Sequence, residues 1–107
     1  MSFAVVLTED ALRDLDDLTA FIAAQDGLER ADDVLDRMHE KLASLRDFPE
    51  RGEYPPELAA LGIRQFRQIH YKPWRMVYQV SADIVTVLLI ADDRQDMQTR
   101  LQRRLLG

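Results

Sequence analysis

The sequence contains no cysteine, and this absence excludes several classes of protein. Without a thiol, the chain can form no disulfide, thiolate zinc site, iron–sulfur cluster or cysteine nucleophile. Long hydrophobic runs are also missing, because the longest one, Ile84–Ala91, spans eight residues and a bilayer requires roughly 20. The N-terminal residues lack the basic segment of a signal peptide. We therefore expect a soluble cytoplasmic protein.

Glycine is scarce too, and the motifs of common enzymes are missing. The four glycines form no phosphate-binding loop, and no serine has the setting of a nucleophile. Asp92, Asp93 and Asp96 offer the oxygen ligands that a hard divalent cation prefers. A helix-capping role for Asp96 and a solvated turn explain these three residues more simply. We therefore predict no metal site and no cofactor.

The 107 residues have the size of one globular domain (1–107), and their charges are unevenly distributed. Residues 1–61 carry 15 acidic and 6 basic side chains, a net −9, whereas residues 62–107 carry 4 acidic and 8 basic ones, a net +4. This asymmetry predicts an acidic face and a basic face, and the basic face either meets an anionic partner or stays solvated. The net charge of −5 counts against sequence-specific DNA binding by this chain alone.

Apolar spacing in the first half predicts a strand followed by two helices. Residues Ala4–Leu7 form a short apolar run, and the Thr8 hydroxyl can cap the helix that follows. Apolar residues at three- and four-residue steps predict that this helix ends near Gly27. A second helix then carries a single apolar seam, formed by Leu28, Ala31, Leu35, Met38, Leu42 and Leu45. Together the two helices predict an antiparallel hairpin whose apolar stripe needs a partner surface.

The second half predicts an antiparallel sheet and a short final helix. Proline and glycine leave room for at most one helical turn between Glu50 and Gly62. Extended segments follow over residues 63–70, 74–80 and 84–91, and the last is apolar on both faces, so we expect it to be central or covered on both sides. Asp96 then opens the final helix. The order β-α-α-β-β-β-α predicts an α+β fold, with the N-terminal strand and the helical hairpin packed on a mainly antiparallel four-stranded sheet.

The stretch from Gly62 to Arg75 combines four cations, one histidine and three aromatic residues. Guanidinium groups grip phosphate and aromatic rings stack on unpaired bases, so this mixture is typical of an RNA-facing strand. The alternative is that these arginines are solvent-exposed partners of the acidic helices. Strand alternation places Arg64 and Arg67 on opposite faces unless a bulge intervenes. His70 is a weaker candidate, for proton transfer.

The chain resembles the RelE/ParE superfamily of toxins, and it is more similar to the ParE branch. The resemblance rests on an acidic helical hairpin, an x-Arg-x-x-Tyr strand at Arg75 and Tyr78, an apolar strand that ends in an Asp-x-Arg-x-Asp turn, and an arginine-bearing C-terminal helix. This ordered set covers nearly the full chain. It implies a small cytoplasmic toxin of a type II toxin–antitoxin (plasmid stabilisation) module, neutralised by a cognate antitoxin whose C-terminal segment wraps over it.

The resemblance also distinguishes two activities. RelE-like members cut messenger RNA on the ribosome with two arginines and a tyrosine. Arg75 matches the first arginine, whereas Gln95 and Leu101 stand where the second arginine and the tyrosine are expected. Arg94 could supply the missing cation, but Leu101 offers no proton donor. ParE-like members poison DNA gyrase by binding, and the unmatched catalytic positions favour this branch.

We therefore predict an inhibitor of DNA gyrase with no confident catalytic residue. The predicted target-binding residues are Arg64, Arg67, Trp74, Arg75 and Arg94. We expect the antitoxin to bind as an amphipathic helix, acidic or of mixed charge, against the basic side of the sheet and the apolar edges of the hairpin. The predicted hairpin contacts are Leu15, Leu18, Ile22, Leu35, Met38 and Leu42.

Two alternatives stay open. The first is a ribosome-dependent endoribonuclease in which Arg75 and Arg94 hold phosphate and His70 or water moves protons. The second is an attenuated toxin that only binds its antitoxin. It is motivated by the turn at 92–96, which reads Asp-Asp-Arg-Gln-Asp where similar sequences often read Asp-Gly-Arg-Arg-Asp.

Overall fold

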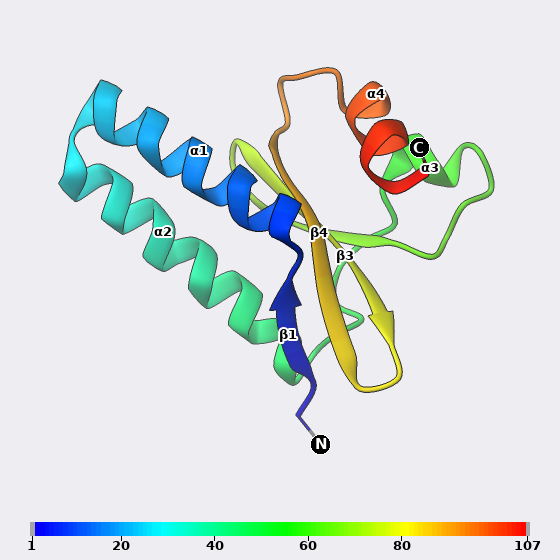
Figure 1. Ribbon diagram of the computed structural model, residues 1–107. Coiled ribbons are helices and arrows are strands. Elements are labelled where there is room, and N and C mark those ends of the chain that lie inside the picture. The colour runs from blue at the N-terminus through cyan, green and yellow to red at the C-terminus, as the bar shows by residue number, and fades with distance from the viewer. Residues whose placement is uncertain (1, 107) are drawn as a thin grey trace.

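The computed structural model describes residues 2–106, and its first half is a strand followed by a helical hairpin (Figure 1). Strand β1 (Ala4–Leu7) leads into α1 (Glu9–Asp26), and the Thr8 hydroxyl caps this helix by accepting from the Ala11 amide at 3.1 Å. Gly27, with a φ of 93°, turns the chain into α2 (Leu28–Ala43), which ends in a single 3₁₀ turn, η1 (Ser44–Arg46). A side chain at Gly27 would be strained in that conformation. The predicted hairpin is confirmed.

The second half forms most of the sheet. Its elements are α3 (Pro56–Ala59), β2 (Arg67–Tyr71), β3 (Trp74–Ser81), β4 (Ile84–Asp92), α4 (Met97–Leu101) and a π-helical turn, η2 (Gln102–Leu106). The strand order is β1-β4-β3-β2, with β1 parallel to β4 and the other pairs antiparallel. The predicted α+β class, the mainly antiparallel sheet and the central place of the last strand are confirmed.

The hairpin covers one face of the sheet, and α3 and α4 cover part of the other (Figure 1). The larger core lies under the hairpin, where Val34 and Met38 of α2 are buried together with Met76 and Tyr78 of β3. The smaller core lies on the opposite face. It consists of Leu58, Phe66, Val77, Leu89, Ala91, Met97 and Leu101. Among the helices of residues 2–106, none is long and apolar enough to cross a membrane.

Two expectations about local structure are wrong. Leu28 is 76% exposed at the tip of the hairpin. Val34, which the predicted seam omits, is fully buried, whereas the adjacent Leu35 is only partly buried. The segment expected to be extended from residue 63 joins the sheet only at Arg67. Its first residues turn back to α3, since the Ile63 amide donates to the Leu58 carbonyl at 3.0 Å and Phe66 packs into the smaller core.

A β-bulge interrupts β4 at Leu88. Tyr78 pairs with Val87 and Val77 with Leu89, so Leu88 has no partner on β3. A bulge shifts the alternation of a strand by one residue. The backbone N–H and C=O groups that point away from β3 therefore follow a different alternation before and after Leu88. This change falls where β1 ends.

Candidate functional site

The charged side chain of Arg75, on β3, is almost completely enclosed. Its guanidinium donates twice to the Glu57 carboxylate, with both N–O distances 2.7 Å, and its Nε donates to Asp93. The same group donates to the Gln68 side chain at 3.2 Å. These hydrogen bonds hold the pKa of Glu57 below its ordinary value and raise that of Arg75. Arg75 is 8% exposed. Through its pairs with Glu57 and Asp93 it ties α3 and the β4–α4 turn to the sheet.

This geometry disfavours the prediction that Arg75 contacts a target. A phosphate or a partner's carboxylate would have to displace Glu57 and Asp93, which already form the charge-assisted pairs that a guanidinium favours. Glu57 and Gln68 were not singled out in the sequence. The signal that could have found them is weak, because a Glu in a proline-rich linker and a Gln in a strand are common at exposed positions.

Tyr78, the tyrosine of the x-Arg-x-x-Tyr strand, has a structural role. It is fully buried, and its hydroxyl donates to the Pro49 carbonyl at 2.7 Å and accepts from the Gly52 amide at 3.0 Å. Burial raises the pKa of this phenol. A Cβ on Gly52 would lie 2.5 Å from the Tyr78 hydroxyl oxygen, so the close approach requires glycine there. The motif thus fixes the 49–52 loop against the sheet.

Arg64 and Arg67 lie together beside β2, around the ring of Tyr54. The Arg67 guanidinium carbon is 4.6 Å from the ring centroid and that of Arg64 is 5.8 Å from it. Arg67 also donates to the Gly52 carbonyl at 2.9 Å and to the Tyr54 hydroxyl at 3.2 Å. The expectation that the two arginines face opposite ways fails because Arg64 precedes the strand. The hydrogen bonds to Gly52 and Tyr54 hold the Arg67 guanidinium in place, whereas Arg64 is exposed.

Trp74 and Arg94 line a hollow between α1 and the β4–α4 turn, at the other end of the sheet. The hollow has a volume of about 360 Å³, and Phe21 and Leu18 of α1 form its apolar wall. Phe21 is 67% exposed, although it is aromatic. The exposed Arg94 pairs with Asp92, with an N–O distance of 2.6 Å. The structure therefore divides the predicted target-binding residues between two separate surfaces and the enclosed Arg75 site.

The other residues of the ribonuclease alternative are differently placed. His70 lies opposite Arg75 in the β2–β3 register, and its Nδ1 is 3.8 Å from a Glu53 carboxylate oxygen. Leu101 is fully buried in the smaller core. The Gln95 side chain accepts from Arg100 at 2.9 Å. The two positions at which the resemblance expects an arginine and a tyrosine thus hold an amide that is paired with Arg100 and a buried leucine.

The C-terminal aspartates form hydrogen bonds with protein groups. Asp96 accepts from the Thr99 amide at 3.2 Å and caps α4, as predicted. Asp93 accepts from Arg75, and Asp92 accepts from Arg94. Within residues 2–106, no group of three or more acidic or histidine side chains has the arrangement of a metal site.

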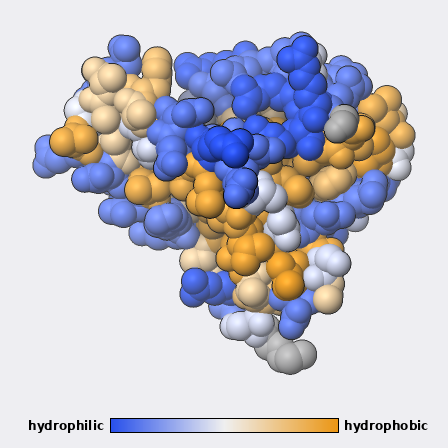
Figure 2. Space-filling view, viewed as in Figure 1, coloured by the Kyte–Doolittle hydropathy of each residue, from blue (hydrophilic) through white to orange (hydrophobic). Residues whose placement is uncertain are grey.

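Most of the predicted antitoxin contacts lie in the larger core. Leu15, Ile22, Met38 and Leu42 are buried between the hairpin and the sheet, and Leu18 and Leu35 are partly exposed. A partner that binds this folded structure can reach Leu18 and Leu35 but not the four buried side chains. Exposed apolar residues include Phe21 on α1. Figure 2 shows a further hydrophobic area in the region of β1 and β4, where Val6 is 46% and Ile84 is 42% exposed.

Comparison with known proteins places this architecture in one family. The model of the ParE toxin of the type II toxin–antitoxin system parDE matches residues 5–97. The chain is 27% identical to Toxin ParE3 of Caulobacter vibrioides over 100 residues, which cover 94% of this chain and 96% of that protein. The chain therefore belongs to the ParE toxin family.

Two solved structures share the fold. A structure of the chromosomal ParDE system from P. aeruginosa superposes with a TM-score of 0.71 at 18% identity, over 85% of this chain and 96% of that one. A free arginine-to-alanine mutant of E. coli toxin RelE superposes with a TM-score of 0.62 at 18% identity, over 98% and 100% of the two chains. The RelE/ParE resemblance is thus confirmed, and the chain is a toxin of ParE type.

Proposed function

We propose that this ParE-type toxin inhibits DNA gyrase by binding to it, and that a cognate antitoxin neutralises the toxin in the cytoplasm. The observation that carries the proposal is the enclosure of Arg75 by Glu57, Asp93 and Gln68. Arg75 is the one residue that matches the RNA-cleaving constellation directly, and its donors are engaged by the protein's own carboxylates. An inhibitor that acts by binding does not need this group to be free.

The proposal assigns the target contact to Arg64, Arg94 and Trp74. Arg64 and Arg94 are exposed, and a guanidinium at a protein interface can form bidentate pairs with carboxylate or phosphate. Trp74 is partly exposed beside Phe21, and aromatic residues often anchor such interfaces. Arg67 positions Arg64 through the shared Tyr54 ring, and Arg75 keeps a structural role.

A supercoiling assay with the antitoxin-free chain tests this proposal. We expect purified gyrase to lose supercoiling activity and to accumulate cleaved DNA as the chain is added. Arg64→Ala and Arg94→Ala should each raise the concentration for half-inhibition about tenfold, since each removes a charged interface contact worth about 1.5 kcal/mol. Arg103→Ala is the matched control, because Arg103 is an exposed arginine that lines neither the hollow beside Trp74 nor the surface around Tyr54. Unchanged supercoiling at large molar excess would exclude gyrase as the target.

The ribonuclease alternative keeps one favourable observation, the pairing of His70 and Arg75 across β2 and β3. Expression of the chain alone in bacteria, with labelled precursors of DNA and protein, separates the possibilities. DNA synthesis should fail first if gyrase is the target, and protein synthesis should fail first if messenger RNA is cut. If neither fails, the chain is an attenuated toxin that only binds its antitoxin.

A further inference from the structure

The edge of β4 loses its neighbouring strand halfway along. β1 pairs with β4 only as far as Leu7 and Val87, and the Thr8 amide makes the last backbone bond, to the Val87 carbonyl at 3.0 Å. The chain then turns away as α1. Among residues 2–106, therefore, no strand neighbours this side of β4 beyond Leu88. An edge of this kind presents backbone donors and acceptors on which another chain can pair.

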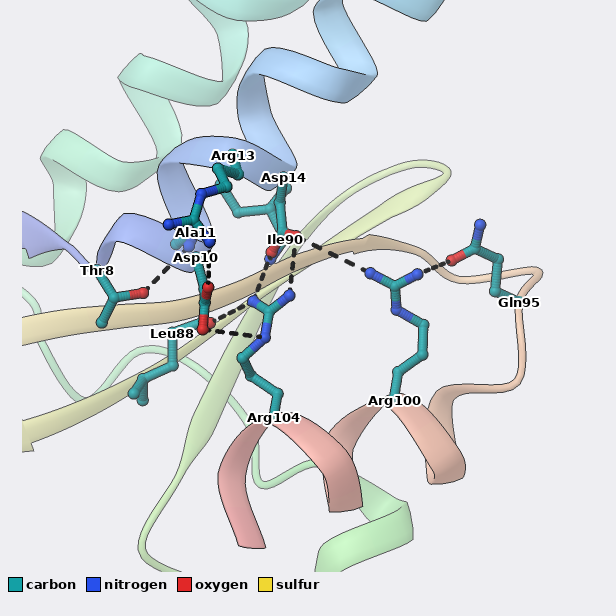
Figure 3. Close-up of polar contacts among 10 residues, drawn as sticks. All are labelled: Thr8, Asp10, Ala11, Arg13, Asp14, Leu88, Ile90, Gln95, Arg100 and Arg104. Atoms are coloured by element: carbon teal, nitrogen blue, oxygen red, sulfur yellow. Dashed lines mark hydrogen bonds and ion pairs between the residues drawn. The ribbon is translucent and has the colours of Figure 1, made fainter. Parts of the chain in front are cut away.

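Two side chains cover the first of these backbone groups (Figure 3). Asp14 of α1 accepts from the Ile90 amide at 3.0 Å, and Arg104 of η2 donates to the Leu88 carbonyl at 2.8 Å. Arg104 and Asp14 are themselves joined by two hydrogen bonds of 2.8 and 3.0 Å. A single residue of a neighbouring strand would supply the same pair, one donor and one acceptor. We call Asp14 and Arg104 the edge cap.

The edge cap can open without leaving either charge unpaired. Arg100 is 4.0 Å from the Asp14 carboxylate, and Asp10 is 3.9 Å from the Arg104 guanidinium (Figure 3). Each member of the cap thus has a second partner of opposite charge close by. Burying a charge without a partner is what makes such pairs costly to break. The neighbouring Asp10 and Arg100 lower that cost here.

Open space adjoins the cap on the same edge. The Asp93 amide donates across to Pro73 on the β3 side, so alternation directs the Asp92 amide and the Ile90 carbonyl to the open side. The hollow of about 360 Å³ lies there, with Phe21 on its apolar wall. Its polar lining carries both signs of charge and consists of Arg94, Arg100, Asp14, Asp17 and Asp92. A strand placed along this edge would direct alternate side chains to these two walls.

We propose that β4 from Leu88 to Asp92 is a docking edge for an extended segment of the antitoxin, which displaces the edge cap and adds a strand. Naming the antitoxin as the source rests on the proposed function. The occupant alternates apolar residues, which pack on Phe21, with charged residues of both signs. Its acidic residues meet Arg94 and Arg100, and its basic residues meet Asp17 and the Asp14 carboxylate that the opened cap leaves. The backbone of the segment replaces Asp14 at the Ile90 amide and Arg104 at the Leu88 carbonyl.

Amide hydrogen exchange tests this proposal on the full chain, alone and in complex with a co-expressed antitoxin. The Asp92 amide should exchange rapidly in the free toxin and become protected in the complex, because it gains a backbone acceptor. The Ile90 amide should stay protected in both states, first through Asp14 and then through the segment. A protected Asp92 amide in concentrated toxin alone would mean that a second copy occupies the edge, and would overturn the proposal.

Arg104→Gln provides a second, independent test. Without the charge of Arg104 the cap opens more easily, so the antitoxin should bind about three- to tenfold more tightly. Arg103→Gln removes the same charge from a neighbouring exposed position and should leave affinity unchanged. Circular dichroism shows whether each variant folds. If Arg104→Gln does not fold, the exchange experiment on the unmodified chain still tests the proposal.

Two failures can be told apart. If the antitoxin binds but the Asp92 amide still exchanges at the free rate, the docking edge is wrong and the toxin–antitoxin proposal survives. If the antitoxin does not bind the chain at all, both proposals fail together. Weaker binding by Arg104→Gln, with Arg103→Gln unchanged, would make Arg104 a direct antitoxin contact and would also contradict the displacement.

Discussion

The two faces of the sheet are stabilised in different ways. Under the hairpin, the core between the helices and the sheet is apolar, with Val34 and Met38 fully buried. On the opposite face, the smaller core is joined to an ion-pair network in which Arg75 ties Glu57 and Asp93 to β3. Apolar packing contains no group that titrates, whereas ion pairs depend on pH and are screened by salt. The face that carries the C-terminal helix is therefore the one that solution conditions can loosen.

The largest expected effect comes from opening a cavity in the hairpin core. Met38→Ala should lower the free energy of unfolding by about 3–4 kcal/mol, because Met38 is fully buried. Leu101→Ala in the smaller core should cost about 2–3 kcal/mol and should expose mainly α4 and η2 to exchange, since this core is shared by fewer elements. Denaturant unfolding with hydrogen exchange measures both effects.

Leu106→Ala is the control for these two variants, because Leu106 is half exposed. It should change the free energy of unfolding by less than about 0.5 kcal/mol. Equal loss of exchange protection across all elements in both Met38→Ala and Leu101→Ala would mean that the two cores unfold as one unit, and the contrast between the faces would disappear.

A smaller effect is expected from the ion-pair network. Glu57→Gln keeps the shape of the side chain but removes one charge from the pair with Arg75, which is itself almost buried. We expect a loss of about 1–3 kcal/mol in the free energy of unfolding, because hydrogen bonds to charged groups contribute about that much. Glu50→Gln, at an exposed glutamate, should have no measurable effect. A loss below 0.5 kcal/mol, on the order of a surface pair, would show that solvent screens the network.

Much of the fold could be predicted because periodicity and capping are local properties of the sequence. Thr8 and Asp96 cap their helices as expected, and β4 is central as its two apolar faces predict. Leu28 was misplaced because it lies at a helix end, where the chain turns and the apolar stripe no longer meets the sheet.

The site was less predictable, because its geometry depends on contacts between residues far apart in the chain. Glu57 reaches Arg75 across 18 positions, and Arg104 reaches Asp14 across 90. No local pattern indicates which acid meets which arginine. Sequence alone therefore treated Arg75 as free to bind a target, whereas the fold encloses it.

The smallest expected effect is the pH dependence of the Arg75 network, and its sign can be worked out. Arg75 holds the pKa of Glu57 below the value it has in the unfolded chain, about 4.3. The stability that this pair contributes is therefore complete above the unfolded pKa and is lost as pH falls through the folded pKa. Asp92 and Asp96 also have lowered pKa values, so the unmodified chain alone would not isolate Glu57.

The difference between the unmodified chain and Glu57→Gln does isolate it, because the other carboxylates titrate in both. A protonated glutamic acid has nearly the shape and charge of glutamine, so the two proteins should converge in stability as pH falls. We expect their difference in the free energy of unfolding to be constant above about pH 5 and to shrink below about pH 4. Urea titrations at a series of pH values measure it. A difference that stays constant down to about pH 2.5 would mean that Glu57 acts on Arg75 through packing rather than charge, and both faces of the sheet would then depend on packing.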